Sequence, residues 1–338
     1  DSNGLNYQGE DDTYIVEYST SGQTVSIVYS GATVGWIPES DVDVTDAPVA
    51  PPTQKGIFGY GTTGSYVSLS NLVNSSGVVA TDVTGVGTAR AFLAAAGYGL
   101  DKAIFGYGNS GSHVSITNLV SNSGVVATDT TGVGTVRADL AATGYGTDKA
   151  IFGYGEGASI FSLTNLVSNS GVVASDTTGV GTARTYLAAT GYGTDKAIFG
   201  YGYDGSNSSL TNLVSNVGVV AADVTGVGTT RRTLGAAGYG GDKAIFGYGF
   251  AGSVTAITNL VSNTGVVSAD VTGVGTARRA QNGGTSYGGD KAIFAYGTTG
   301  SYVSVSNLVS NSGVVATDTT GVGTARQGLA AAGYSISA

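Results

Sequence analysis

The sequence predicts an all-β protein: a six-bladed β-propeller with four-stranded blades, closed by its C-terminal strand. First, one motif, Ile-Phe-Gly-Tyr-Gly or a close variant, recurs at Ile57, Ile104, Ile151, Ile198, Ile245 and Ile293. Second, each repeat contains short apolar runs separated by glycine turns, which is the pattern of a propeller blade. Third, the chain ends in a strand that its first repeat lacks. Together these observations favour a ring of similar sheets.

The repeats begin near residues 55, 102, 149, 196, 243 and 291, at spacings of 47, 47, 47, 47 and 48. The extra residue falls within 281–286, a segment that departs from the other repeats. Leucine-rich repeats are shorter, about 20–29 residues, and helical repeats need a 3.6-residue period that is absent here.

One unit, 93–137, indicates four strands, at 93–98, 102–107, 113–120 and 125–130. The first is rich in Ala and Gly, which suits the innermost position, where blades converge. The third alternates apolar and polar residues, as a half-buried strand does.

The ends of the repeat array predict closure. Leu329–Tyr334 matches the small-residue strand that no segment supplies before the first repeat. We expect it to pair beside Ile57–Tyr60, which completes the sixth blade and removes exposed sheet edges.

The first residues differ from the repeats. Residues 1–47 predict a small β module with strands at 14–18, 24–29 and 32–37. Residues 48–54 hold three of the four prolines and predict a stiff linker to the propeller, 55–338.

Composition excludes several classes of function. The absence of cysteine removes disulfides and thiolate sites, and a single histidine, His113, rules out a His-rich metal site. The net charge of −9 disfavours nucleic acid. No apolar run approaches the roughly 20 residues of a membrane span. We therefore expect no cofactor, no metal, no nucleic-acid partner and no membrane insertion.

The segment 90–108 resembles a kelch blade. Arg90 precedes the inner strand, and Gly106-Tyr107-Gly108 stands where kelch repeats carry a glycine pair. The resemblance covers 55–338, although the usual kelch tryptophan and the tyrosine of strand three are missing. It implies architecture rather than activity, because galactose-oxidase-like chemistry would require a cysteine.

The near-identical repeats, rich in Gly, Ala, Ser, Thr and Val, are also similar to repeat-containing structural proteins of tailed bacteriophages. The N-terminal module, with Gly35-Trp36-Ile37-Pro38 before an Asp/Val/Thr segment, resembles small β modules of such proteins. This resemblance implies a place in a tail, a fibre or the capsid surface, and hence a virion-surface or extracellular location.

An arginine recurs in each repeat, eight residues after an aspartate. The pairs are Asp82/Arg90, Asp129/Arg137, Asp176/Arg184, Asp223/Arg231, Asp270/Arg278 and Asp318/Arg326. We expect these arginines to be structural, bonded to blade carbonyls or an aspartate between neighbouring blades; a ring of arginines that binds an anion is the alternative. Calcium needs six to eight oxygens, more than one aspartate per repeat supplies.

Variation between repeats is confined to two segments, the loop after the second strand and the residues after the arginine. Alternating strand directions place both on one face. Aromatic side chains lie in these segments and are candidates for binding a sugar or a protein. They are Tyr66, Phe92, His113, Phe161, Tyr186, Tyr203, Phe250 and Tyr302. Unconstrained drift in loops that touch nothing is the competing interpretation.

The leading functional hypothesis is a non-enzymatic structural or adhesion protein of a tailed-phage virion, present in many copies. Its N-terminal module would contact other virion proteins, and its variable face a host glycan or protein. The alternative is a secreted or cell-surface lectin-like propeller. An enzyme is the poorest option, because no nucleophile–base pair or carboxylate pair clusters in the sequence.

Overall fold

The computed structural model describes residues 27–29, 36–38 and 53–337. The chain divides into two compact units, Asp1–Pro51 and Pro52–Ala338. The described residues form strands and no helix, so they contain no helix long and apolar enough to cross a membrane.

In the first unit, β1 (Ile27–Tyr29) pairs antiparallel with β2 (Trp36–Pro38). The rings of Tyr29 and Trp36 lie 5.4 Å apart between their centroids. The strand predicted at 14–18 and residues 48–52 of the predicted linker lie outside the described residues.

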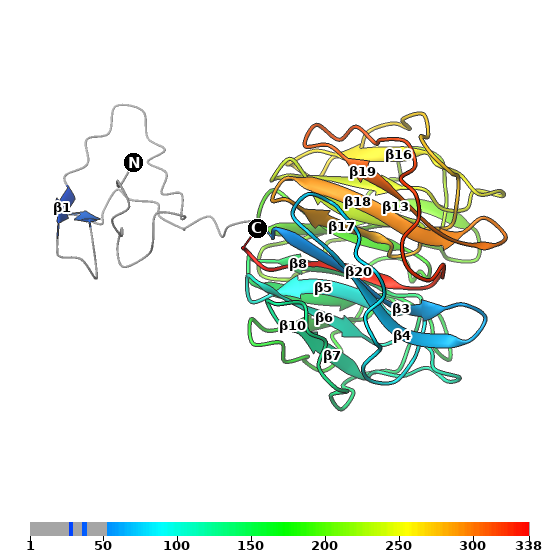
Figure 1. Cartoon of the computed structure of the whole chain (residues 1–338), viewed down its shortest axis with the longest axis horizontal. Helices are drawn as coiled ribbons and strands as arrows, with labels where there is room; N and C mark the ends of the chain where they lie inside the picture. Colours follow the sequence, from blue (N-terminus) through cyan, green and yellow to red (C-terminus); the bar gives the residue numbers. More distant parts are fainter. Residues whose placement is uncertain (1–26, 30–35, 39–52, 338) are drawn as a thin grey trace. The chain divides into compact units, whose positions relative to one another are not determined.

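The second unit consists of six three-stranded antiparallel sheets (Figure 1). The small-residue first strands are β20 (Ala330–Tyr334), β5 (Ala94–Tyr98), β8 (Ala141–Tyr145), β11 (Ala188–Tyr192), β14 (Gly235–Tyr239) and β17 (Gly284–Tyr287). The middle strands are β3 (Lys55–Thr62), β6 (Lys102–Gly106), β9 (Lys149–Gly153), β12 (Lys196–Tyr203), β15 (Lys243–Gly247) and β18 (Lys291–Thr298). The third strands are β4 (Tyr66–Val73), β7 (Thr117–Val120), β10 (Thr164–Val167), β13 (Asn207–Val214), β16 (Thr258–Val261) and β19 (Tyr302–Val309).

The first strands contact one another in a cycle: β5 with β8, β8 with β11, β11 with β14, β14 with β17, β17 with β20, and β20 with β5. Small side chains permit this approach; a Cβ on Gly97 of β5 would lie 3.2 Å from the carbonyl oxygen of Gly333 in β20. The all-β arrangement is compatible with a β-propeller.

The predicted pairing of the chain ends is confirmed. Strand β20 pairs antiparallel with β3, from Ala330 opposite Gly59 to Tyr334 opposite Lys55. A strand from the C-terminus therefore belongs to the same sheet as the first repeat.

The apolar core is divided into six clusters between neighbouring sheets. Adjacent residues of a middle strand point to opposite faces, so Ile57 and Phe58 belong to different clusters. The Phe105 ring fills the space beside Gly59 of the neighbouring sheet, where a Cβ would lie only 2.6 Å away. This glycine therefore allows close packing between sheets; the sixth repeat has the small Ala295 at the same position.

The prediction of four regular strands per repeat is wrong, because the fourth segment forms only isolated bridges. Ser70 of β4 bridges Val83, and Val73 bridges Val79. The two bridges are three residues apart on β4 but four residues apart on the fourth segment. Between these bridges, the Asn71 side-chain amide donates to the carbonyl oxygen of Ala80 at 3.0 Å. The unequal spacing and this side-chain bond prevent a continuous ladder.

Candidate functional site

The two ends of the six-sheet unit differ in sequence. The constant end carries the Asp–Lys turns between first and second strands, such as 99–102, and is also where Lys55 and Tyr334 pair. The variable end carries the loops after the second strands and the residues after the buried arginines. In Figure 1 the loop joining β3 and β4, which belongs to the variable end, lies at the right of this unit.

At the variable end, the two variable segments of neighbouring repeats pair with each other. The bridges are Ala91↔Asn109, Ala138↔Glu156, Thr185↔Tyr203, Arg232↔Phe250, Arg279↔Thr298 and Gln327↔Thr62. The two segments that vary between the repeats of this chain therefore lie side by side and form one continuous surface.

A second set of residues, two positions after most of the buried arginines, surrounds the centre of this end. Phe92, Asp139, Tyr186, Thr233, Asn282 and Gly328 all have φ between 51° and 61°. This left-handed conformation is rare for aromatic and β-branched residues. Backbone amides link most of them: Phe92 donates to Gly328, Asp139 to Phe92, Tyr186 to Asp139, and Thr233 to Tyr186. These bonds between neighbouring repeats hold the unusual conformation in place.

The repeat with the extra residue closes the centre of this end. Gln281 Nε2 donates to Asp139 Oδ1 at 2.6 Å, and Asn282 Nδ2 donates to the carbonyl oxygens of Leu93 and Leu140 at 3.0 and 2.9 Å. Asp139 and Gln281 precede β8 and β17, which lie three steps apart in the cycle of first strands. The inserted segment therefore spans the centre.

Burial, against the lowering effect of the Gln281 hydrogen bond and with a smaller contribution from the nearby Glu156 carboxylate, raises the pKa of Asp139 to about 8. Asp139 is 5% exposed. At neutral pH its carboxyl is therefore mainly protonated. Asp139 and Gln281, which form the floor of the variable end at its centre, then carry little charge.

Above this floor lies a cavity of about 380 Å³, here called the aromatic cavity. It is lined by Phe92, Tyr186, Tyr203, Arg232, Thr233, Arg279, Gln281, Gln327 and Gly328. A wider groove beside it, lined partly by Phe250 and Tyr302, shares Arg279 and Gln327 with it. Aromatic rings and convergent polar groups are characteristic of small-ligand sites.

Two guanidinium groups distinguish the aromatic cavity. Arg232 lies 4.7 Å from the ring centroid of Tyr203 and 5.2 Å from that of Phe250, and Arg279 lies 4.3 Å from the Phe250 centroid. Arg232 donates to Asn207 Oδ1 at 3.3 Å. Among the residues that the structure describes, neither arginine forms an ion pair.

The structure brings together some of the eight candidate aromatics. Phe92, Tyr186 and Tyr203 line the aromatic cavity, and Phe250 and Tyr302 line the adjoining groove. The other three are Tyr66, His113 and Phe161, which line neither. Tyr66 is exposed and donates to Asn109 Oδ1 at 2.9 Å, whereas His113 and Phe161 are half-buried.

The six recurring arginines lie between sheets and are fully buried. Arg90 donates to the carbonyl oxygens of Tyr107 and Thr88 at 2.8 and 3.1 Å and to Asn118 Oδ1 at 2.7 Å. Its guanidinium carbon lies 4.2 Å from the ring centroid of Tyr60 in the preceding sheet. The contact with the tyrosine ring of the preceding sheet recurs at Arg137, Arg184, Arg231, Arg278 and Arg326. The bonds to carbonyl oxygens and to the asparagine recur together at Arg137, Arg278 and Arg326, whereas Arg184 bonds only the asparagine and Arg231 only the carbonyl oxygens. Every guanidinium is thus enclosed by protein.

Each recurring aspartate contacts the preceding repeat, not the arginine eight residues later. The hydroxyl of Thr88 donates to Asp129 Oδ2 at 2.6 Å. The same Thr–Asp contact recurs as Thr135/Asp176, Thr182/Asp223, Thr229/Asp270, Thr276/Asp318 and Thr324/Asp82. Partial burial acts to raise the pKa of each aspartate, but hydrogen bonds from threonine and asparagine outweigh it and lower the pKa.

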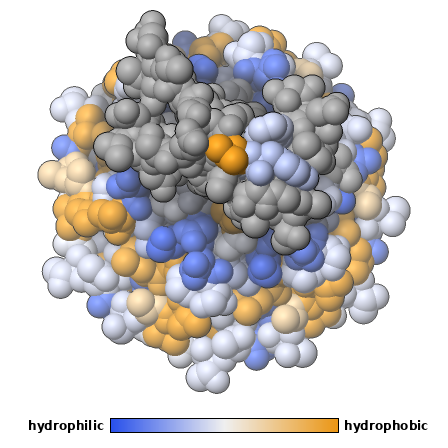
Figure 2. Space-filling model, turned by 90° about the vertical axis from the view of Figure 1, so that its left-hand side faces the viewer, coloured by the Kyte–Doolittle hydropathy of each residue, from blue (hydrophilic) through white to orange (hydrophobic). Residues whose placement is uncertain are grey.

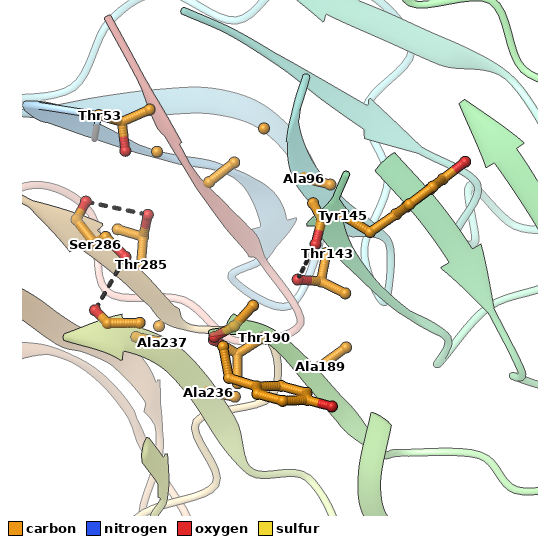
Figure 3. A pocket seen from close by; sticks show the side chains of 18 of the residues that line it. Thr53, Ala96, Thr143, Tyr145, Ala189, Thr190, Ala236, Ala237, Thr285 and Ser286 are labelled. Carbon is orange, nitrogen blue, oxygen red and sulfur yellow. Dashed lines mark hydrogen bonds between the residues drawn. The ribbon is translucent and has the colours of Figure 1, made fainter. Parts of the chain in front are cut away.

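A second cavity, of about 270 Å³, opens between the first strands toward the constant end. Ala96, Thr143, Thr190, Ala237 and Thr285 surround it together with Thr53 (Figure 3). The threonine hydroxyls bond to neighbouring backbone carbonyls. At its mouth, Lys243 is paired with Asp242 at 2.8 Å. Tyr98, Tyr145, Tyr192 and Tyr239 also line this cavity, one from each of four first strands, so its lining is similar from repeat to repeat.

The constant end also carries the Asp–Lys turns and an exposed valine at the same position of every repeat. The valines are Val78, Val125, Val172, Val219, Val266 and Val314. Hydrophilic and hydrophobic groups alternate around this end (Figure 2). The lysines pair with the preceding aspartates at 2.7–2.9 Å, and such exposed pairs contribute little to stability.

Sequence reasoning missed the polar residues of the aromatic cavity: Arg232, Arg279, Gln281 and Gln327, with Asp139 beneath them. The available signal was the change from Ala91 and Ala138 to arginine at the equivalent position of two consecutive repeats.

Within the described residues, no group of three or more His, Cys, Asp or Glu side chains is arranged to hold a metal ion. No protein-family model matches the chain, and no curated protein matches it.

Proposed function

We propose that the six sheets form a closed six-bladed propeller, and that the protein binds a ligand at its variable end without catalysing a reaction. In the fuller form of the proposal, it is a structural or adhesion protein on the surface of a tailed-phage virion. Its N-terminal unit contacts other virion proteins, and the variable end meets a host glycan or protein.

The closed ring is supported by the cycle of contacts among the first strands and by the Thr324–Asp82 contact between the last and first repeats. Ligand binding is supported by one observation above all: variation between repeats is concentrated where aromatic residues line a cavity. Phe92, Tyr186 and Tyr203 come from three different repeats and meet there. Unconstrained sequence drift in the loops would give no reason for aromatic side chains of different repeats to line one cavity.

The chain enters the six-sheet unit at the constant end, where Thr53 lines the central cavity and Gln54 donates its amide to the carbonyl oxygen of Ser335. The variable end lies at the opposite end of the first strands. This polarity suits attachment through one end and recognition through the other.

A glycan array probed with the full chain tests the binding proposal. We expect binding to a defined set of glycans, lost in the triple variant Tyr66→Ala, Tyr186→Ala and Tyr302→Ala. A matched control, Val78→Ala with Val125→Ala and Val172→Ala at the constant end, should keep it. Equal binding by both variants would place recognition elsewhere.

The virion proposal and the lectin-like alternative differ in location. Gold-labelled antibody against the chain, applied to particles and cells of the source, should decorate tailed particles at many positions each. Labelling confined to cell surfaces or secreted material would favour a secreted or cell-surface carbohydrate-binding propeller.

A further inference from the structure

The two cavity arginines occupy a position that does not require arginine for folding. Repeats with Ala91, Ala138 or Thr185 there form the same backbone bridge to the neighbouring loop as Arg232 and Arg279. Equivalent amides donate across these bridges at 2.8–3.1 Å whatever the side chain. The guanidinium groups are therefore additions to a backbone that forms without them.

The guanidinium groups of Arg232 and Arg279 place two positive charges at one site of an acidic chain. The Phe250 ring centroid lies 4.3 Å from the guanidinium carbon of Arg279 and 5.2 Å from that of Arg232, so both cations lie beside the same ring. The chain as a whole carries a net charge of −9. Two neighbouring cations without an ion-pair partner among the described residues repel each other, and a bound anion would relieve that repulsion.

The rest of the cavity suits a polyhydroxylated ring. Phe92, Tyr186 and Tyr203 provide aromatic faces, and Gln281 and Gln327 provide amide groups. Because burial raises the pKa of Asp139 to about 8, the carboxyl beneath Gln281 adds little negative charge at neutral pH. Two further acidic groups belong to this end: the Glu156 carboxylate lies close enough to influence Asp139 and Tyr186, and Asp204 directly follows Tyr203 in the sequence.

We propose that the aromatic cavity binds an acidic sugar residue, with its carboxylate at Arg232 and Arg279 and its ring against Tyr186 and Tyr203. Guanidinium forks recognise carboxylates through paired hydrogen bonds, and aromatic faces accept the apolar face of a sugar. The adjoining groove, which shares Arg279, provides room for the next sugars of a chain. This inference rests on the proposed function and names the ligand class of the same site.

The test compares acidic sugars with a neutral one. Calorimetric titration of the full chain with methyl β-D-glucuronide and methyl β-D-glucoside isolates the carboxylate, and the methyl glycoside of N-acetylneuraminic acid tests a larger acid. We expect at least one acid to bind about tenfold or more tightly than the neutral glucoside, since charged hydrogen bonds are the strong ones. Its affinity should fall as salt rises.

The double variant Arg232→Ala and Arg279→Ala should lose that preference while keeping the thermal midpoint, because alanine is native at the equivalent position of two other repeats. The control Lys196→Ala with Lys243→Ala removes the same charge at the constant end and should leave the affinity unchanged. Equal affinity for acid and neutral sugars, or acid binding that survives the arginine variant, would overturn the inference.

The glycan array separates this inference from the proposed function. Binding to neutral glycans alone, abolished in the tyrosine variant, would refute the acidic-sugar inference and leave the proposed function standing. Absence of binding to every glycan would remove support from both.

Discussion

Thr324 and Asp82 are 242 residues apart in the sequence and directly bonded. The Thr324 amide lies 3.1 and 3.0 Å from the two Asp82 carboxylate oxygens, and its hydroxyl donates to Oδ2 at 2.5 Å. This contact repeats the one between Thr88 and Asp129, so the last and first repeats meet as any two consecutive repeats do.

The Asp82→Ala variant should therefore lower the free energy of unfolding by about 1.5–3 kcal/mol, the range for hydrogen bonds to a charged group. Asp129→Ala should cost a similar amount, measured by chemical denaturation. Asp290→Ala, in an exposed turn, should change stability by about 0–1 kcal/mol. If Asp82→Ala behaved like Asp290→Ala instead, the end-to-end contact would not contribute to stability.

Acid should destabilise the protein below about pH 4. The six aspartates of the Thr–Asp contacts have folded-state pKa values below their ordinary value of 3.8. Their stabilising contribution is complete above 3.8 and is lost as the pH falls through the folded pKa values. Thermal midpoints measured from pH 6 to pH 2 should show this loss, with a smaller loss in Asp129→Asn. A midpoint that stays constant to pH 2 would contradict it.

Asp139 should have the opposite pH dependence. Its folded pKa of about 8 exceeds the ordinary 3.8, so between these values the unfolded chain has released a proton that the folded protein retains. Stability attributable to this group falls as pH rises, by up to about 1.4 kcal/mol per pH unit. Asp139→Asn keeps an acceptor for Gln281 and should be more stable than the native protein at pH 8 but not at pH 3. Thermal midpoints of the two proteins measure this difference. If the variant and the native protein had the same midpoint at pH 8 as well as at pH 3, Asp139 would not be buried in its protonated form.

The buried arginines should be far more sensitive to substitution than the cavity arginines. Arg137 bonds to Tyr154, Thr135 and Asn165, so Arg137→Leu would leave buried acceptors without donors. We expect a loss of about 3–5 kcal/mol. Arg137→Lys should recover only part of it, because lysine lacks the planar fork. Arg232→Ala is the matched control and should be nearly neutral in the same urea titration.

Removal of β20 should leave the edge of β3 unpaired. A chain ending at Gly328 loses every partner from Ala330 to Tyr334, and exposed strand edges promote association. Light scattering after size-exclusion chromatography should show aggregates, whereas a chain ending at Ser335 should behave like the full protein. A monodisperse truncated chain would show that β3 does not need this partner.

The sequence allowed prediction of the repeat, its register, the small-residue first strand and the pairing of β20 with β3, because glycine and alanine periodicity directly reflects close packing. The fourth strand was predicted wrongly. Asn71 and its equivalents look like ordinary strand residues, yet each bonds the fourth segment through its side chain. The aspartate–arginine spacing did not tell which aspartate lies beside which arginine; Arg137, for example, lies beside Asp176 of the next repeat. Asp139 and Gln281 are 142 residues apart, and no local pattern reports such a contact.

The segment that holds Gln281 and Asn282 also affects how many ligands one molecule carries. The loops around the variable end already differ between repeats, and this segment bonds across the centre of that end from one repeat. A single orientation is therefore defined, and saturation there should occur at one equivalent per chain. The constant end is more repetitive, with an Asp–Lys pair in five of the repeats, so a partner that attaches at that end meets a similar surface at each of those five repeats.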